Sequence, residues 1–138
     1  MSIKNKLAAG LLGGLSGGLV FGALMGMMGM LTTISSMFGV DSWAVGLVIH
    51  LMMSIAIGIG FVLVIGNVAF KSNGATVLWS MAYAVAWWVM GVLIAMPLMF
   101  GQVLFALDAT TLLSLMGHVI YGLIMAFVAK KIITKEKE

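Results

Sequence analysis

Four long apolar runs, separated by short polar connections, dominate the chain. Asp, Glu, Lys and Arg are absent from four runs, at residues 7–40, 42–70, 72–107 and 109–129. Each run exceeds the roughly 18–20 residues that a helix needs to cross a hydrocarbon core about 30 Å thick. Because a backbone in lipid must satisfy its own hydrogen bonds, each run is predicted to be helical. The expected fold is an all-α, integral membrane four-helix bundle, with spans at about residues 7–31, 43–66, 75–98 and 109–129.

A motif at the end of the first span recurs at the end of the third. Residues 27–39 read MMGMLTTISSMFG, and residues 89–101 read VMGVLIAMPLMFG. The span after each copy contains a single histidine, His50 or His118, and the chain has no other. The sequence therefore predicts an internal repeat of two spans.

This repeat predicts a single membrane domain over residues 1–138, built from two tandem hairpins at about residues 7–66 and 75–131. Each unit has an even number of spans, so the hairpins are expected to be parallel-related, by a pseudo-two-fold axis along the membrane normal. The two histidines should then lie at the same depth. At 1.5 Å per residue, that depth is roughly 12 Å from the start of each helix.

Composition and charge agree with a membrane protein. The chain is 63% hydrophobic and 8% charged, whereas soluble domains are about 25% charged. Lysines flank both termini and occur at Lys71, while the other two connections contain Asp41 and Asp108. The positive-inside rule then predicts cytoplasmic N- and C-termini. The lipid bilayer is the expected partner, and the lysine pattern indicates topology and no nucleic-acid binding.

The first span is expected to be a packed helix of the mature protein. Its apolar run is longer than the 7–15 residues of a signal-peptide core, and its end belongs to the repeat. Glycines recur in it at a spacing of four, at Gly10, Gly14, Gly18, Gly22 and Gly26. Such a stripe forms a groove that lets another helix approach closely.

Local signals predict where the other helices begin and end. Asp41 and Ser42 are good N-caps for the second span, and Asp108 is one for the fourth. Gly74 is expected in a turn, and Pro97 is expected to end or kink the third span. Lys130 and Lys131 are expected to end the fourth span, before a polar tail to Glu138 that is either frayed or a short helical extension in solution.

The histidine pair is the main candidate site, because an ionisable residue inside a span indicates function by default. Alignment of the repeats places small residues one turn from each histidine. It also matches Gly26 of the first unit with Trp88 of the second, where the two units differ. The predicted pocket residues around His50 and His118 are therefore Gly46, Gly26, Trp88, Ser114 and Gly122.

Several roles for the pair stay open. His50 and His118 could be the axial ligands of a b-type haem. With the methionines of the first and third spans they could instead bind a transition metal such as copper, since thioether and imidazole together suit Cu(I). Without any cofactor, they could be packing groups that bond across helices, or a proton or substrate relay. The absence of cysteine excludes disulfides and thiolate ligands.

The predicted function is electron transfer by a bound haem or metal. The sequence has no phosphate-binding loop, no nucleophile beside a base and no acidic metal cluster, so we expect no hydrolytic enzyme. One alternative is a structural or accessory subunit of a larger membrane complex. Another is a small carrier or channel, which with four spans would function as a homo-oligomer.

The chain resembles an uncharacterised family of small bacterial four-span membrane proteins. The resemblance rests on the Gly/Met-rich first span, on WAVGLVIH in the second span and on LMGHVIYG in the fourth. It implies the duplicated four-span architecture, one histidine in each of these two spans and a bacterial inner (plasma) membrane. It implies no activity.

Overall fold

A computed structural model describes residues 2–135, so Met1 and the last three residues of the expected polar tail lie outside it. Every regular element in this range is helical. The elements are α1 (Ile3–Met27), α2 (Leu31–Ser36), α3 (Trp43–Val64), α4 (Gly66–Ala69), α5 (Asn73–Trp88), the π-helix η1 (Val89–Ala95), α6 (Met96–Phe100) and α7 (Ala109–Lys135). Four stretches are long and apolar enough to span a membrane: α1, α3, the continuous helix Asn73–Phe100, and α7. These findings confirm that the described chain is all-helical, with four helices long and apolar enough to be the predicted spans.

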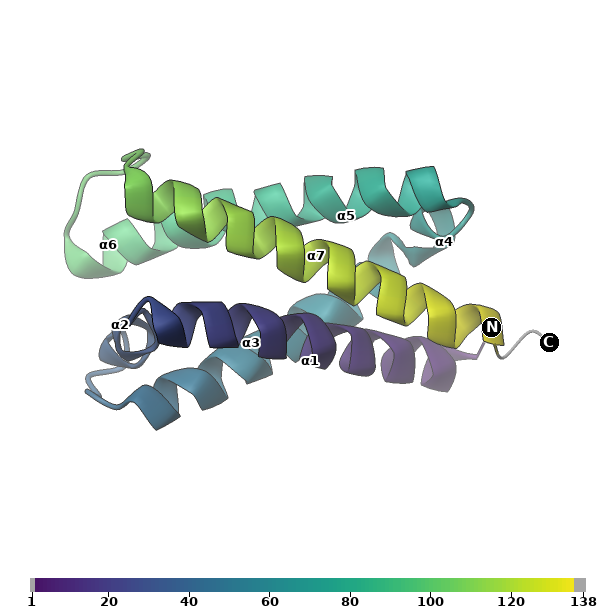
Figure 1. Ribbon diagram of the computed structural model, residues 1–138, viewed down its shortest axis with the longest axis horizontal. Coiled ribbons are helices and arrows are strands. Elements are labelled where there is room, and N and C mark those ends of the chain that lie inside the picture. Colours follow the sequence, from purple (N-terminus) through teal and green to yellow (C-terminus); the bar gives the residue numbers. More distant parts are fainter. Residues whose placement is uncertain (1, 136–138) are drawn as a thin grey trace.

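The long helices run back and forth between two ends of the molecule (Figure 1). The N-terminus, the C-terminal end of α7 and the short α4 lie at one end, and α2 and α6 lie at the other. Helix α1 packs extensively on α3 and on α7, and α7 packs on α5. Helices α3 and α5 have no comparable contact with each other. The bundle therefore has three closely packed seams and one seam that is largely unpacked.

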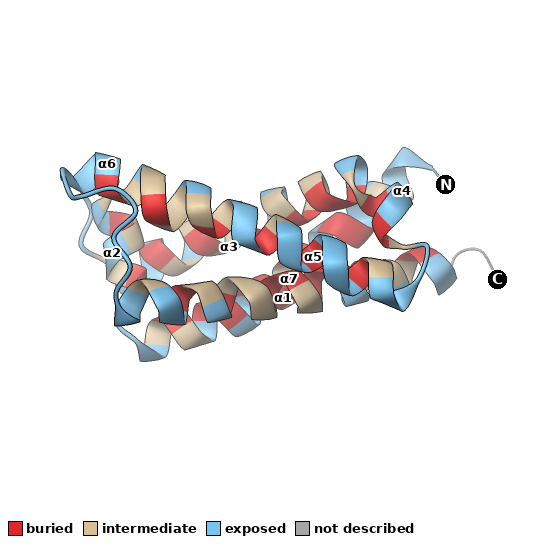
Figure 2. Cartoon of the chain, turned by 90° about the horizontal axis from the view of Figure 1, so that it is seen from above, coloured by how far each residue is buried: buried red, intermediate tan, exposed pale blue. Residues whose placement is uncertain are grey.

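Glycines on two faces of α1 make this helix the centre of the packing. A Cβ added at Gly10 would lie 2.5 Å from the Cα of Ile59 in α3, and one at Gly13 would lie 2.5 Å from the Met125 carbonyl oxygen in α7. Gly14 and Gly18 follow Gly10 on the α3 face. The predicted stripe thus packs on α3, and a second glycine face, which we did not predict, packs on α7. Figure 2 shows buried residues along the facing sides of the helices and exposed residues on the connections.

The repeated motif adopts a different backbone in each copy. In the first, α1 ends at Met27 and Gly29 takes a positive φ of 69°, which starts a separate short helix, α2. In the second, Gly91 lies inside η1 and the helix continues to Phe100. The copies agree at their last residue, because Gly39 (φ 73°) and Gly101 (φ 64°) both adopt the left-handed conformation that favours glycine.

Pro97 lies just after the π-helix, in the first turn of α6. A proline has no N–H, and its ring clashes with the carbonyl four residues earlier, which is that of Leu93. The Leu93 carbonyl instead accepts a hydrogen bond of 3.0 Å from the backbone N–H of Phe105. The helix therefore widens before the proline and ends four residues after it, at Gly101.

The predicted helix starts at Ser42 and Asp108 are correct, and the turn predicted at Gly74 is wrong. Ser42 caps α3 by accepting from the Val45 N–H, and the Asp108 carboxylate accepts from the Thr111 N–H at 2.8 Å. Gly74 lies in the first turn of α5 and not in a preceding turn, because the side chain of Ser72 caps that helix. Helix α7 continues beyond Lys130 and Lys131 to Lys135, which agrees with the expected helical extension, and the Lys130 ammonium donates to Asn73 Oδ1 at 2.9 Å.

Candidate functional site

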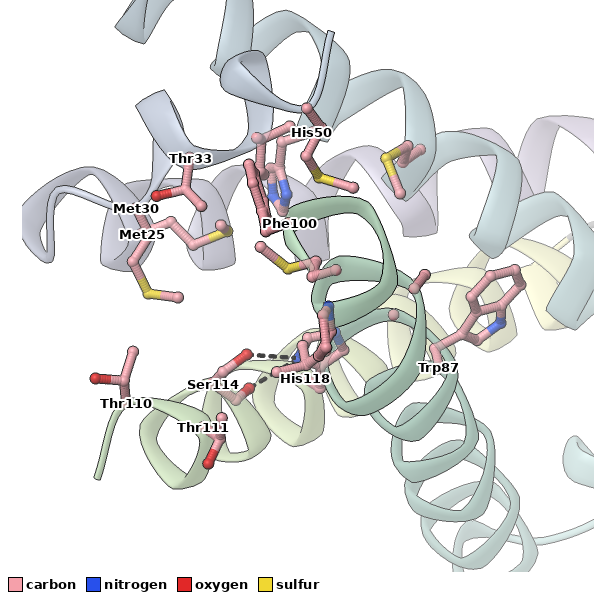
Figure 3. A pocket seen from close by; sticks show the side chains of 18 of the residues that line it. Met25, Met30, Thr33, His50, Trp87, Phe100, Thr110, Thr111, Ser114 and His118 are labelled. Atoms are coloured by element: carbon pink, nitrogen blue, oxygen red, sulfur yellow. Dashed lines mark hydrogen bonds between the residues drawn. The ribbon is translucent and has the colours of Figure 1, made fainter. Parts of the chain in front are cut away.

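A cavity of about 1050 Å³ lies between the α1–α3 pair and the helices α5 to α7. It occupies the end of the molecule that contains α2 and α6. Both histidines line it, His50 from α3 and His118 from α7. Figure 3 shows the two rings on opposite sides of this space. Both predicted histidines therefore line one cavity, and their joint role in a site stays a prediction.

His50 is held against α1 by a hydrogen bond that fixes its tautomer. Its Nε2 lies 2.9 Å from the Gly18 carbonyl oxygen, and the ring edge also faces Gly22. Because a carbonyl can only accept, Nε2 carries the proton and Nδ1 of the neutral ring has a free lone pair. The neighbouring Ser54 hydroxyl donates to the His50 carbonyl at 2.7 Å, and its oxygen lies 3.5 Å from the protonated Nε2, on the other side of the ring from the free lone pair.

His118 has the opposite tautomer. Its Nδ1 donates to the carbonyl of Ser114, one turn earlier in α7, at 2.8 Å (dashed in Figure 3). The free lone pair of the neutral ring is therefore on Nε2. In the described part of the chain, no side-chain nitrogen or oxygen is both fully buried and without a hydrogen-bond partner. Neither free nitrogen has a hydrogen-bond partner among the described residues, so neither is fully buried.

The ring of Phe21 in α1 lies next to both histidines. Its centroid is 5.4 Å from that of His50 and 4.9 Å from that of His118, and both contacts are edge-on. Phe21 in turn fills the space beside Gly117, where an added Cβ would overlap the ring. The two imidazoles are thus held by a shared aromatic contact and do not bond to each other.

Sulfur and oxygen atoms supplement the imidazoles in an otherwise apolar lining. Five methionines line the cavity: Met25, Met30, Met37, Met53 and Met96. Asp41 and Asp108, which follow the two motif copies, also belong to the lining and supply the only carboxylates in it. Within residues 2–135, no group of three or more His, Asp or Glu side chains could hold a metal ion. A metal would therefore need thioether, hydroxyl or non-protein ligands.

The floor of the cavity is closed by a tyrosine that joins α7 to α3. Tyr121 is 5% exposed and donates from its hydroxyl to the Ser54 carbonyl at 2.6 Å. A second tyrosine, Tyr83 in α5, donates to the Ile57 carbonyl of α3 at 3.0 Å. These two hydrogen bonds join α7 and α5 to α3 at a level farther from α2 and α6 than the histidines are.

The predicted pocket residues divide into two groups. Ser114 lines the cavity and holds His118. The other four do not line it, because each is used in packing. Gly46 faces the Leu31 carbonyl, Gly122 faces Ser80 and Ala84, and Gly26 faces Leu31 and Trp43. Trp88 is buried against α7, where its Nε1 donates to the Thr111 carbonyl at 2.9 Å.

Sequence reasoning missed three residues of the site. Phe21 lies one residue before Gly22 on α1, and nothing in the spacing separates it from the other apolar residues of the run. Trp87, adjacent to the predicted Trp88, is the tryptophan that lines the cavity. Tyr121, three residues after His118, was identifiable as a hydroxyl in the middle of a span. Such a group usually finds a partner when it is buried.

Comparison of the chain with protein-family models, with curated proteins and with solved structures gave no match.

Proposed function

We propose that this membrane protein binds a small ligand in the cavity through the free nitrogens of His50 and His118. One observation carries the proposal: each ring donates its single N–H to a backbone carbonyl and keeps an accessible lone pair. Ligand sites are typically apolar cavities of about 300–1,000 Å³ with a few well-placed polar groups. The cavity fits that description at the upper limit of size.

A soft transition-metal ion such as Cu(I) is the first ligand class. Metal-binding histidines almost always donate their second ring N–H to a carbonyl or carboxylate, which orients the ring and raises its basicity. The methionine sulfurs add soft donors, and carboxylates in the lining, at Asp41 and Asp108, would attract cations. A b-type haem between the two rings is less favoured, because Phe21 lies beside both and would have to move. Either cofactor would give the protein a role in electron transfer.

The second ligand class is an organic molecule with a hydroxyl or amine group. A free imidazole nitrogen accepts a hydrogen bond as readily as it binds a metal. The mostly apolar lining would hold the rest of such a molecule. This class corresponds to a carrier-like function.

Histidine-to-glutamine variants separate the classes. Gln keeps a hydrogen-bond donor and an acceptor at each position but is a poor ligand for Cu(I). The experiment uses protein purified in detergent from copper- and haem-replete cells, with elemental analysis and visible spectra before and after dithionite. Loss of bound metal or haem in H50Q and H118Q supports the first class. Wild-type protein that remains free of metal and haem, even after Cu(I) is added, refutes it.

We infer further that the protein lies in a bacterial inner membrane as two tandem hairpins, with both termini cytoplasmic. The end of the bundle that carries α4, the start of α1 and the C-terminal end of α7 also carries the lysines of the described residues, which supports this orientation. Because the chain has no cysteine, single cysteines report topology directly. An impermeant maleimide added to intact cells with a permeable outer membrane should label S36C and not G74C. Labelling of G74C and not of S36C would indicate the opposite orientation.

A further inference from the structure

The unpacked seam between α3 and the helix 73–100 gives the cavity a lateral opening. Met53 and Ile57 line the cavity from α3, and Trp87, Gly91 and Val92 line it from α5 and η1. Met53 lines the cavity and is also 51% exposed, so the cavity reaches the outer surface at this side chain. In a spanning helix, that surface faces the hydrocarbon of the bilayer.

The lower edge of the opening is well defined. Tyr83 closes the seam through its bond to the Ile57 carbonyl and through a ring contact of 5.2 Å with Phe61. Above this point α3 has no extensive contact with η1 or α6. Gly91 lies in this upper part, and an added Cβ there would meet nothing within 4 Å. The wall formed by η1 is therefore free of obstruction where it borders the cavity.

The opening suits a thin, flexible occupant. A helix with its side chains is about 10–12 Å across, and the Tyr83–Ile57 bond prevents α3 and α5 from separating that far. An alkyl chain needs much less width and loses no hydration when it moves from the bilayer into an apolar cavity. The lining along this route consists of Met53, Ile57, Trp87 and Val92, which present methyl, thioether and aromatic surfaces.

We propose that the cavity takes a single-chain amphiphile from the bilayer, with a hydroxyl head at the histidines and its chain in the seam between Met53 and Gly91. This inference rests on the proposed function, because the hydroxyl of the head group donates to one of the same two imidazole nitrogens. The head must be a hydrogen-bond donor, since each ring has already used its own N–H on a carbonyl. A long-chain alcohol, phenol or quinol has this chemistry.

Two probes of equal length test the head-group requirement. The full-length protein in nanodiscs is incubated with 4-dodecylphenol or with its methyl ether, and bound adducts are measured by native mass spectrometry. The phenol should bind as one molecule per chain and about tenfold more tightly than the ether, which cannot donate. Equal binding of the two probes, or no binding of either, overturns the inference. Metal binding by the same preparation would leave the proposed function standing.

Blocking variants test the route. G91F should place a ring in the opening and weaken phenol binding at least about tenfold. A86F, on the exposed side of the same helix and outside the cavity lining, should bind as the wild type does. M53W blocks the opposite edge and keeps the test valid if G91F does not fold, which circular dichroism would reveal. Wild-type binding in a folded G91F or M53W overturns the lateral route.

Discussion

The glycine stripe of α1 makes a position-specific prediction about stability. We consider Gly14→Ala, which adds one methyl group where α1 meets α3. The new Cβ would overlap the Ser54 carbonyl oxygen and lie 3.0 Å from the Cα of Ile55. Both are backbone atoms, so no side chain can rotate away. The helices must move apart by several tenths of an ångström or more.

The expected change in the free energy of unfolding has three contributions. Overpacking of a close contact costs about 1–3 kcal/mol. Replacing a helical Gly by Ala stabilises the helix by up to about 1 kcal/mol, which offsets part of that cost. Displacement of α3 also stretches the Tyr121–Ser54 hydrogen bond, worth about 1 kcal/mol. Gly14→Ala should therefore destabilise the protein by about 1–3 kcal/mol.

Gly26→Ala is the matched control on the same stripe. Its Cβ would lie 3.5 Å from Leu31 Cδ1 and 3.6 Å from Trp43 Nε1, which are ordinary contacts. This variant should be neutral or stabilised by up to about 1 kcal/mol. Unfolding by SDS in mixed micelles, followed by far-UV circular dichroism, measures both free energies. Equal stabilities of G14A and G26A would refute the packing of α1 on α3.

Three further substitutions test contacts at other places. Tyr121→Phe removes the hydroxyl that donates to the Ser54 carbonyl, so SDS titration should show a loss of about 1 kcal/mol in the free energy of unfolding. An unchanged midpoint would mean that this bond does not join α7 to α3. Asp108→Ala removes the carboxylate that caps α7 at Thr111 and should cost about 1 kcal/mol in the same assay. Asp41→Ala should cost less, because Ser42 caps α3, and a larger loss for D41A than for D108A would contradict these cap assignments.

The local features of the fold were predictable because each depends on a short stretch of sequence. The lengths of the uncharged runs determined the spans, and the caps at Ser42 and Asp108 follow from side-chain chemistry within three residues. The repeat also associated His50 with His118, which the geometry of the cavity agrees with. Periodicity was sufficient for these features, since none requires knowledge of which helices are neighbours.

Features that depend on helix neighbours were not predictable. A glycine stripe indicates close packing but does not identify the partner, so the second face at Gly13 and Gly17 went unnoticed. For the same reason small residues near the histidines, such as Gly46, were assigned to a pocket when they instead allow helix contact. The motif copies also diverge at Gly29 and Gly91, because a glycine permits a positive φ without requiring it.

The central claim is that each histidine presents one unprotonated ring nitrogen to a ligand. NMR of protein labelled with ¹⁵N in the histidine rings tests it most directly. Without ligand, Nδ1 of His50 and Nε2 of His118 should give the signals of unprotonated nitrogens, assigned with single H50Q and H118Q variants. On addition of Cu(I), these two signals should shift while the carbonyl-bonded nitrogens change little. On addition of 4-dodecylphenol, which has a single O–H to donate, one of the two should shift. Reversed protonation, or no shift with either probe, would contradict the account.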